Sequence, residues 1–244
     1  MKIGIIGTGN VGATLARKLA ACGHQVKIAN SRGPQSIQHL ASEIGAKAVT
    51  KEEVVSDVDV VIISIPFANY PDLKQTLSKA PEKTVVIDTS NYYPARDGAI
   101  KEVDDGKPES VWVSEQIGRP VIKAWNAALA ATLADKGGPA ESSTRIALPV
   151  AGGNIYAERI AQDLVEDTGF IALAAGTLED SWRQQPGTPA YCTELTLPKL
   201  RLALLLADKA RAPQNRDALI AKFMASDSQL THEQIVALNR AMTA

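Results

Sequence analysis

A short run of glycines near the amino terminus constrains the fold of this chain more than any other feature. Residues 3–6 form an apolar run long enough for one buried strand, and Gly7, Gly9 and Gly12 follow in the spacing G-x-G-x-x-G. A helical pattern of apolar residues comes next, and a second apolar run begins at Val26. A strand, a glycine turn, a helix and a strand in immediate succession predict the first unit of a parallel α/β sheet.

Each glycine of this turn has a physical role. Gly7 allows the tight turn out of the strand, Gly9 lets a pyrophosphate approach the backbone, and Gly12 lets the helix pack close to the sheet. The amino terminus of the helix offers N–H groups and a partial positive charge to phosphates. An ordinary turn with three glycines is the alternative. We expect dinucleotide contacts from the whole loop and the first turn of the helix, at Gly7, Thr8, Gly9, Asn10, Val11 and Gly12.

The end of the second apolar run indicates which dinucleotide is bound. Sites for NAD usually carry Asp or Glu there to bind the ribose 2′-OH, whereas this chain has Asn30, Ser31 and Arg32. A carboxylate would repel a 2′-phosphate, but Ser31 can donate a hydrogen bond to it and Arg32 can pair with it. We therefore expect NADP(H) at these three residues. A solvated Arg32 would leave use of NAD(H) open.

Composition and charge exclude several other classes of protein. The formal net charge of the 244 residues is −1 with mixed signs, which gives no case for a nucleic acid or an anionic membrane as partner. No apolar run approaches the ~20 residues of a membrane span, and the first strand begins too early for a signal peptide. Cys22 and Cys192 are isolated and form no metal or redox motif. We expect two reduced thiols, no metal site and a cytoplasmic protein.

Strands and helices alternate up to about residue 176, which is the pattern of one doubly wound, mostly parallel sheet of the Rossmann type. Residues 51–56 are expected to form a short helix between two of the strands. We expect a dinucleotide-binding domain over residues 1–178 and a helical extension over residues 179–244. Because residues 200–206 are too apolar to face water, the extension should pack on the sheet, on a second copy of the chain, or on both. A homodimer is the expected assembly.

Several segments together resemble a known family: GTGNVGATLARKLAACGH, the strand end at residues 30–32, DTSNYYPARDG, VIKAWNA and PVAGGN. Over roughly residues 2–180 the chain resembles the NADP-dependent oxidoreductase family typified by the reductase of the deazaflavin coenzyme F-420. The ferric-reductase domain of the STEAP membrane proteins looks like a relative of that family. The resemblance implies a Rossmann fold, NADP(H) as cofactor and a flat redox ring as acceptor. The segment from Trp182 to Cys192 has no counterpart that the resemblance explains.

The resemblance also implies where the nicotinamide lies, near the ends of the fourth and sixth strands. Carried over to this chain, it predicts cofactor contacts at Ile65, Pro66, Asn91, Ala124, Trp125 and Asn126. Each polar or aromatic residue has a simpler alternative: core packing for Trp125, a turn cap for Asn126 and an Asx-turn for Asn91. Ligand contact is favoured for Asn126 because its amide can both donate and accept. Lys123 is more simply a solvated charge at a strand end than a general acid.

The sequence offers no catalytic acid, since His24, His39 and His232 all lie away from the predicted carboxyl edge of the sheet. Hydride transfer to a flavin-like ring does not need such an acid in the way that reduction of a carbonyl does. The first hypothesis is therefore an NADP(H)-dependent oxidoreductase with deazaflavin, flavin or ferric complexes as acceptor. Two alternatives stay open: a reductase of small imines or carbonyls, and a non-catalytic NADP(H) sensor that binds a partner protein.

Overall fold

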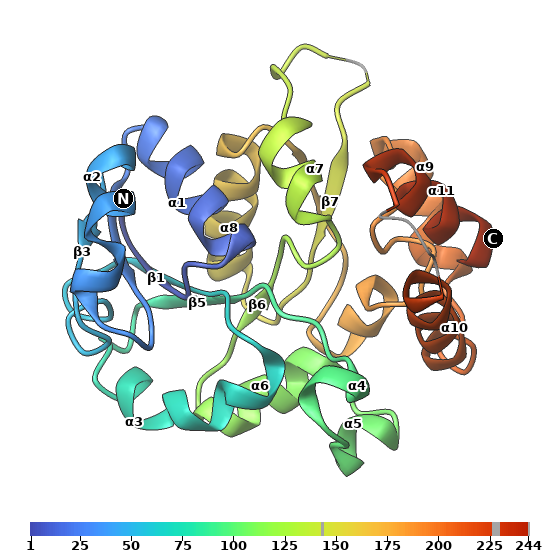
Figure 1. Ribbon diagram of the computed structural model, residues 1–244, viewed down its shortest axis with the longest axis horizontal. Coiled ribbons are helices and arrows are strands. Elements are labelled where there is room, and N and C mark those ends of the chain that lie inside the picture. Colours follow the sequence, from blue (N-terminus) through green and yellow to red (C-terminus); the bar gives the residue numbers. More distant parts are fainter. Residues whose placement is uncertain (143, 226–229, 244) are drawn as a thin grey trace.

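The computed structural model describes residues 1–142, 144–225 and 230–243, and within them a parallel sheet forms the centre of the molecule (Figure 1). Its strand order is β3-β2-β1-β4-β5-β6, which confirms the doubly wound α/β fold. The strands are β1 (Lys2–Ile6), β2 (Gln25–Ala29), β3 (Lys47–Ala48), β4 (Val60–Ile63), β5 (Val85–Asp88) and β6 (Ile122–Lys123). The chain order reverses between β1 and β4, so the switch point lies between these two strands.

Helices cover both faces of this sheet. Side chains alternate along the strands, so Ile5 and Ile62 pack into the core on one face, whereas Ile6 and Ile63 pack into the core on the other. In Figure 1 the helices α1 (Asn10–Ala21), α7 (Ala130–Asp135) and α8 (Ile155–Asp167) lie above the sheet, and α3 (Lys74–Leu77) and α6 (Glu109–Ile117) lie below it. The smaller elements are η1 (Pro34–Ile37), α2 (Gln38–Ile44), η2 (Phe67–Leu73), α4 (Pro94–Asp97), α5 (Lys101–Asp104) and η3 (Glu179–Gln184).

The expectation that every strand up to residue 176 joins one sheet is wrong. The strands β7 (Ala147–Val150) and β8 (Ile171–Ala174) form a separate parallel pair. An isolated antiparallel bridge between Lys123 and Ala151 connects this pair to the main sheet. Pro149 explains why a longer ladder does not form, because it has no N–H to donate to a neighbouring strand. Its carbonyl instead accepts a hydrogen bond from the side chain of Gln184.

The short helix expected over residues 51–56 is also wrong, since this segment forms turns. Thr50 and Glu53 exchange the reciprocal side-chain bonds that can open a helix: the Thr50 amide donates to Glu53 and the Glu53 amide donates to Thr50 Oγ1. The segment then reaches Asp57, whose φ of +51° lies in the left-handed region. The segment therefore forms turns and no helix.

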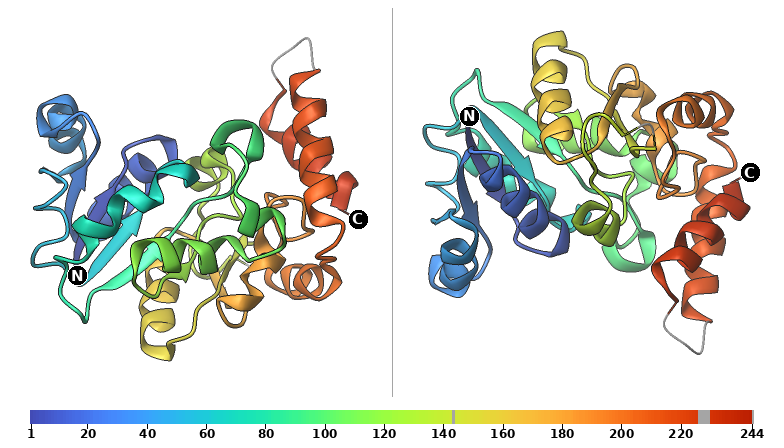
Figure 2. Two further views of the ribbon diagram at one scale, coloured as in Figure 1. Left: turned by 90° about the horizontal axis from the view of Figure 1, so that it is seen from below. Right: turned by 90° about the horizontal axis from the view of Figure 1, so that it is seen from above.

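Three helices make the carboxyl-terminal part: α9 (Leu197–Leu206), α10 (Ala212–Met224) and α11 (His232–Thr243). Both views of Figure 2 place them at one end of the molecule. Leu200 and Leu204 of α9 are buried in a cluster with residues of β7 and β8, whereas Leu202 and Leu205 on the same helix are exposed. The extension thus packs on the strand pair with part of its apolar surface. No helix in the described part of the chain is long and apolar enough to cross a membrane.

Candidate functional site

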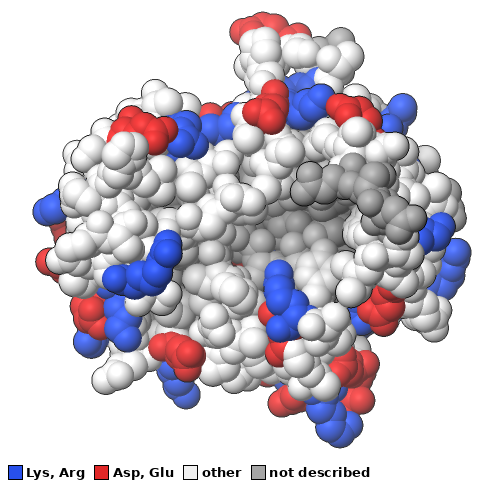
Figure 3. Space-filling view, in the orientation of Figure 1, with Lys and Arg blue, Asp and Glu red and all other residues white. Residues whose placement is uncertain are grey.

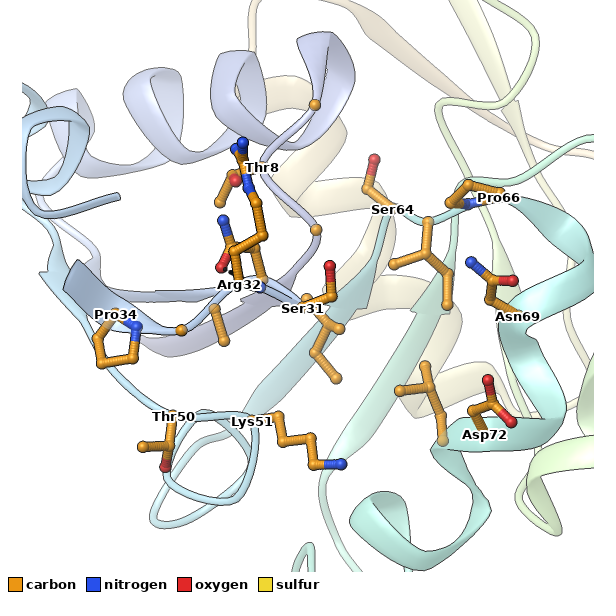
Figure 4. A pocket seen from close by; sticks show the side chains of 18 of the residues that line it. Thr8, Ser31, Arg32, Pro34, Thr50, Lys51, Ser64, Pro66, Asn69 and Asp72 are labelled. Atoms are coloured by element: carbon orange, nitrogen blue, oxygen red, sulfur yellow. Dashed lines mark hydrogen bonds between the residues drawn. The ribbon is translucent and has the colours of Figure 1, made fainter. Parts of the chain in front are cut away.

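A cleft of about 690 Å³ opens at the carboxyl ends of β1, β2 and β4 (Figure 4). Thr8, Ser31 and Arg32 lie on one side of it, and Pro66 and Asn69 face them from the other side. The cleft brings together these sequence-predicted residues: Gly7, Thr8, Gly9, Asn30, Ser31, Arg32, Ile65 and Pro66. Its remaining walls include residues that the sequence did not single out, among them Thr50, Lys51, Glu52, Ser64, Asn69 and Asp72.

The three glycines of the turn have different physical reasons to be glycine. A Cβ on Gly7 would lie 2.0 Å from the carbonyl oxygen of Ser64, and the φ of Gly7 is +102°. A Cβ on Gly12 would lie 2.0 Å from the carbonyl oxygen of Gly7 itself. A Cβ on Gly9, by contrast, would meet no atom of the protein within 4 Å. The fold therefore requires Gly7 and Gly12, whereas the space beside Gly9 is open.

The first turn of α1 faces this open space. Gly9 is the N-cap of the helix and has no side chain with which to cap it, so it leaves the N–H groups of the first turn to a ligand. Asn10 and Val11 supply two of these amides. The backbone N–H groups and the partial positive charge of the helix terminus make this end of the cleft suited to a pyrophosphate.

The turn after β2 presents the residues expected at the 2′-phosphate. The side chain of Asn30 shapes this turn, because its Oδ1 accepts from the Arg32 amide at 3.1 Å and its Nδ2 donates to Ser36 Oγ at 2.9 Å. Ser31 and Arg32 are exposed and line the cleft. Lys51 lines it as well and adds a second cation (Figure 4). A single Lys in a turn carries no sequence signal, which is why it was missed.

The other sequence-predicted residues lie farther along the same edge, after β5 and β6. Ala124 and Trp125 are buried, and the Trp125 indole packs in the core and donates to Thr168 Oγ1 at 3.1 Å. This is the core-packing alternative for Trp125. Its φ of +59° is unusual for a bulky residue, and it turns the chain so that Asn126 follows at the sheet edge.

Asn126 and Asn91 form a pair of amides at this edge. Asn126 Nδ2 donates to Asn91 Oδ1 at 3.0 Å, and Asn91 Nδ2 donates to the Asn126 carbonyl oxygen at the same distance. Gln184, from the segment that the sequence left unexplained, donates from Nε2 to Asn126 Oδ1 at 2.9 Å. Asn126 is 2% exposed, so its side chain is enclosed by protein.

The expectation that Lys123 is a solvated charge is wrong. Its side chain is 0% exposed, and Nζ donates to the Ser90 carbonyl oxygen at 3.1 Å and to Glu109 Oε2 at 3.3 Å. Asp88, also buried, lies 3.7 Å from Nζ and accepts hydrogen bonds from Tyr70 and from the amide of Ser90. Burial raises the pKa of Glu109, although the Lys123 ammonium opposes the shift. This cluster holds Ser90, and with it the neighbouring Asn91, in place.

No histidine is among the described residues that line the cleft. His24 Nε2 contacts Asp167 at 3.0 Å, and His232 Nε2 contacts Glu194 at 2.6 Å. The hydroxyls of Tyr93 and Tyr191 are 2.6 Å apart, and burial raises the pKa of both phenols. Neither phenol therefore loses its proton in the ordinary pH range.

Comparisons with known proteins agree with this geometry. Residues 2–92 match the family model described as NADP oxidoreductase coenzyme F420-dependent. The chain belongs to this family. Protein YjhV of Escherichia coli (strain K12) is 36% identical over 104 residues, which are 43% of this chain and 76% of YjhV. The crystal structure of the hypothetical protein SMa0349 from Sinorhizobium meliloti is 30% identical and aligns with a TM-score of 0.69 over 80% of this chain and 95% of that one.

Two more distant relatives bear on the resemblance seen in the sequence. A crystal structure from Arthrobacter sp. FB24, described as a candidate F420-dependent NADP-reductase, shares the fold at 18% identity, with a TM-score of 0.61 over 92% of this chain and 94% of that one. The metalloreductase STEAP3 of Rattus norvegicus is 24% identical over 84% of this chain, which is 39% of STEAP3. The predicted membership of the F420-dependent oxidoreductase family is thus confirmed. The family match spans the glycine loop and the turn after β2 and ends at residue 92.

The glycine loop generates a paired test. We expect Gly9→Val to abolish NADPH binding with an unchanged melting temperature, because its side chain would fill the open space in which we expect the pyrophosphate. Gly12→Val should instead lower the melting temperature, since its Cβ would overlap the backbone of Gly7. Thermal unfolding by circular dichroism and titration of NADPH fluorescence measure the two effects. Native NADPH affinity in the folded Gly9 variant would mean that this loop is not the phosphate site.

The buried charge cluster generates a pH-dependent test. Lys123→Met leaves Glu109 and Asp88 buried without their cation, so we expect a loss of about 3–5 kcal/mol in the free energy of unfolding at pH 7. Burial raises the pKa of Glu109 and the Lys123 ammonium lowers it, so loss of this cation raises the pKa further, and the folded variant binds the proton more tightly than the folded wild type does. The deficit should therefore shrink between about pH 7 and pH 5.

Urea unfolding followed by tryptophan fluorescence measures this deficit at each pH. Lys101→Met is the matched control, since Lys101 pairs with Asp105 on the exposed surface and should leave stability nearly unchanged. A deficit of the same size at both pH values would contradict the assignment of Glu109 as the group that takes up the proton.

Proposed function

We propose that this protein is an NADP(H)-dependent oxidoreductase that transfers a hydride between NADPH and a flat, flavin-like acceptor. One observation carries the proposal: the phosphate-binding loop and the 2′-phosphate residues line a single cleft at the switch point of a doubly wound sheet. Membership of an NADP oxidoreductase family supports the same reading.

The orientation of the cofactor follows from the order of the strands. Ser31 and Arg32 follow β2, so the adenosine half with its 2′-phosphate lies on that side of the glycine loop. The pyrophosphate lies at the start of α1. The nicotinamide half then extends past Ile65 and Pro66, at the end of β4, toward the loops after β5 and β6. The protein would hold the nicotinamide ring there, within reach of an acceptor.

The surface beside these loops supports an acceptor whose reacting part is a flat ring without charge. Figure 3 shows a hollow between the sheet and the carboxyl-terminal helices, and most of its visible surface is neither acidic nor basic. A ring that stacks on the nicotinamide gains its orientation from the stack, so positioning replaces acid catalysis. Deazaflavin coenzyme F420 is the first acceptor that the family relationship proposes, followed by flavins and ferric complexes.

The buried side chains favour a ring acceptor over a carbonyl or an imine. Reduction of a carbonyl needs a donor that protonates an alkoxide near neutral pH. Lys123 is committed to Glu109 and Ser90, and Tyr70 donates to Asp88. A reductase of small imines or carbonyls is therefore the second candidate. A protein that binds NADPH and shows no turnover with any acceptor would be a sensor.

We also propose that the protein assembles as a homodimer through α9. Leu202, Leu205 and Leu206 are 56%, 77% and 66% exposed, respectively, on the side of this helix that faces away from β7 and β8. A second copy of the chain would remove these side chains from water. Light scattering across the micromolar range measures the assembly, and a monomer at every concentration would reject it.

Cofactor preference should depend on Arg32. A charge-assisted pair with a phosphate contributes roughly 1.5–3 kcal/mol, so Arg32→Ala should weaken NADPH binding about ten- to a hundredfold. Binding of NADH, which lacks the 2′-phosphate, should stay nearly unchanged. Arg159→Ala, which removes an exposed cation on α8 that pairs with Asp163, is the control and should affect neither cofactor. Equal losses of NADPH and NADH affinity for Arg32→Ala would remove the assignment.

The acceptor is tested by measuring oxidation of NADPH at 340 nm with a panel of compounds. We expect F420 or a flavin to react faster than any small aldehyde, ketone or imine. Between about pH 6 and pH 8 the rate should vary little, because no histidine is among the described residues that line the cleft and the buried phenols keep their protons. Faster turnover of a carbonyl or an imine, with a bell-shaped pH profile, would support the second candidate.

A further inference from the structure

The segment that begins at Trp182 places one amide against Asn126, one of the residues expected near the nicotinamide. Gln184, the last residue of η3, has a side chain that is 0% exposed. Its Nε2 donates to Asn126 Oδ1 at 2.9 Å and to the Pro149 carbonyl oxygen at 3.3 Å. The backbone carbonyl oxygen of Gln184 accepts from Asn126 Nδ2 at 2.8 Å. Gln184 therefore binds both ends of the Asn126 amide.

These bonds leave Asn126 little capacity for a ligand. One amide has two N–H hydrogens and two acceptor positions on its oxygen. Asn126 donates to Asn91 Oδ1 and to the Gln184 carbonyl oxygen, and its oxygen accepts from Gln184 Nε2. Because the Gln184 side chain donates to one end of this amide and the Gln184 backbone carbonyl accepts from the other, the amide of Asn126 has a single favourable orientation.

That orientation is passed on to Asn91. Asn91 accepts from Asn126 Nδ2 and donates to the Asn126 carbonyl oxygen, both at 3.0 Å. The side chain of Asn91 then retains one N–H hydrogen and one acceptor position. Asn91 is only partly buried, unlike Asn126 and Gln184. It is thus the member of this chain of amides that can meet a ligand.

Asn91 also stands where a nicotinamide would need it. It follows β5, which neighbours β4, and the end of β4 lines the cofactor cleft through Ile65 and Pro66. A cofactor with its 2′-phosphate at the end of β2 extends its nicotinamide in this direction. The carboxamide of nicotinamide carries one N–H₂ group and one carbonyl, which complement the free acceptor and donor of Asn91.

We propose that Gln184 is a positioning residue of the nicotinamide subsite. It orients Asn126, and Asn126 orients Asn91 to pair with the carboxamide of the cofactor. This inference rests on the proposed function, because it needs NADPH in the cleft. It assigns a role to the segment after Trp182, which contributes the Gln184 amide that bonds to Asn126.

The test compares two ligands that share the 2′-phosphate half. NADPH has the nicotinamide, and adenosine 2′,5′-bisphosphate lacks it. The variant Gln184→Met keeps the length of the side chain and removes the amide, and Asn91→Ala removes the group that meets the ligand. The control is Gln185→Met, since the Nε2 atom of Gln185 is buried without a partner in the described residues. Melting temperatures show whether each variant is folded.

We expect Gln184→Met and Asn91→Ala each to weaken NADPH binding about three- to tenfold, the loss of one or two neutral hydrogen bonds. Affinity for adenosine 2′,5′-bisphosphate should change less than twofold in both variants, and Gln185→Met should change neither affinity. Because Gln184 acts through Asn91, the double variant should bind NADPH no more weakly than Asn91→Ala alone.

Three results would overturn the inference: equal losses for both ligands, additive losses in the double variant, or native NADPH affinity in Asn91→Ala. If Gln184→Met fails to fold, Asn126→Ala, tested singly and in combination with Asn91→Ala, gives the same comparison. Failure of the proposed function has a different signature. Wild-type protein that binds NADPH but transfers no hydride to any acceptor contradicts the oxidoreductase proposal alone, whereas wild-type protein that binds no NADPH contradicts both.

Discussion

The backbone contact between the glycine turn and β4 determines the geometry of the whole cleft. At Gly7 and Gly12 a Cβ would lie 2.0 Å from a carbonyl oxygen, so only glycine lets the turn approach the end of β4 and lets α1 approach the turn. This approach directs the first turn of α1 into the cleft and sets Ser64 beside it. The space beside Gly9 belongs to the same arrangement. Gly7 and Gly12 lie against backbone carbonyl oxygens, whereas a Cβ on Gly9 would meet no protein atom within 4 Å.

Beyond the glycine turn, the edge of the sheet is built from buried polar groups. Burial of three charged side chains, Lys123, Asp88 and Glu109, costs desolvation free energy. Hydrophobic residues of similar volume would not carry this cost. Their bonds converge on Ser90 and leave Asn91 in a defined place. Gln184 approaches the same loops from the other side. The two halves of the proposed cofactor site therefore differ: the half after β2 is exposed, and the half after β5 and β6 is mostly buried.

The exposed half was the part that sequence reasoning described best. The glycine spacing and the absence of a carboxylate at residues 30–32 located residues that the structure brings into one cleft. The enclosed half was described poorly. Asn126 was expected to meet the ligand, whereas its amide is taken up by Asn91 and Gln184, and Lys123 was expected in water, whereas it is buried. Neither Glu109 nor Gln184 carries a signal in its local sequence.

What the sequence by itself determined is the local backbone chemistry: a strand, a turn that only glycine permits, a helix start and a strand end without a carboxylate. These features depend on residues that are neighbours along the chain, so their types suffice. What only the tertiary structure decided is which distant residues meet. Gln184 and Asn126 are 58 residues apart, and Lys123 and Asp88 meet because β5 and β6 are adjacent. Pro149 takes β7 out of the main sheet, and that departure gives the side chain of Gln184 a free carbonyl to bind.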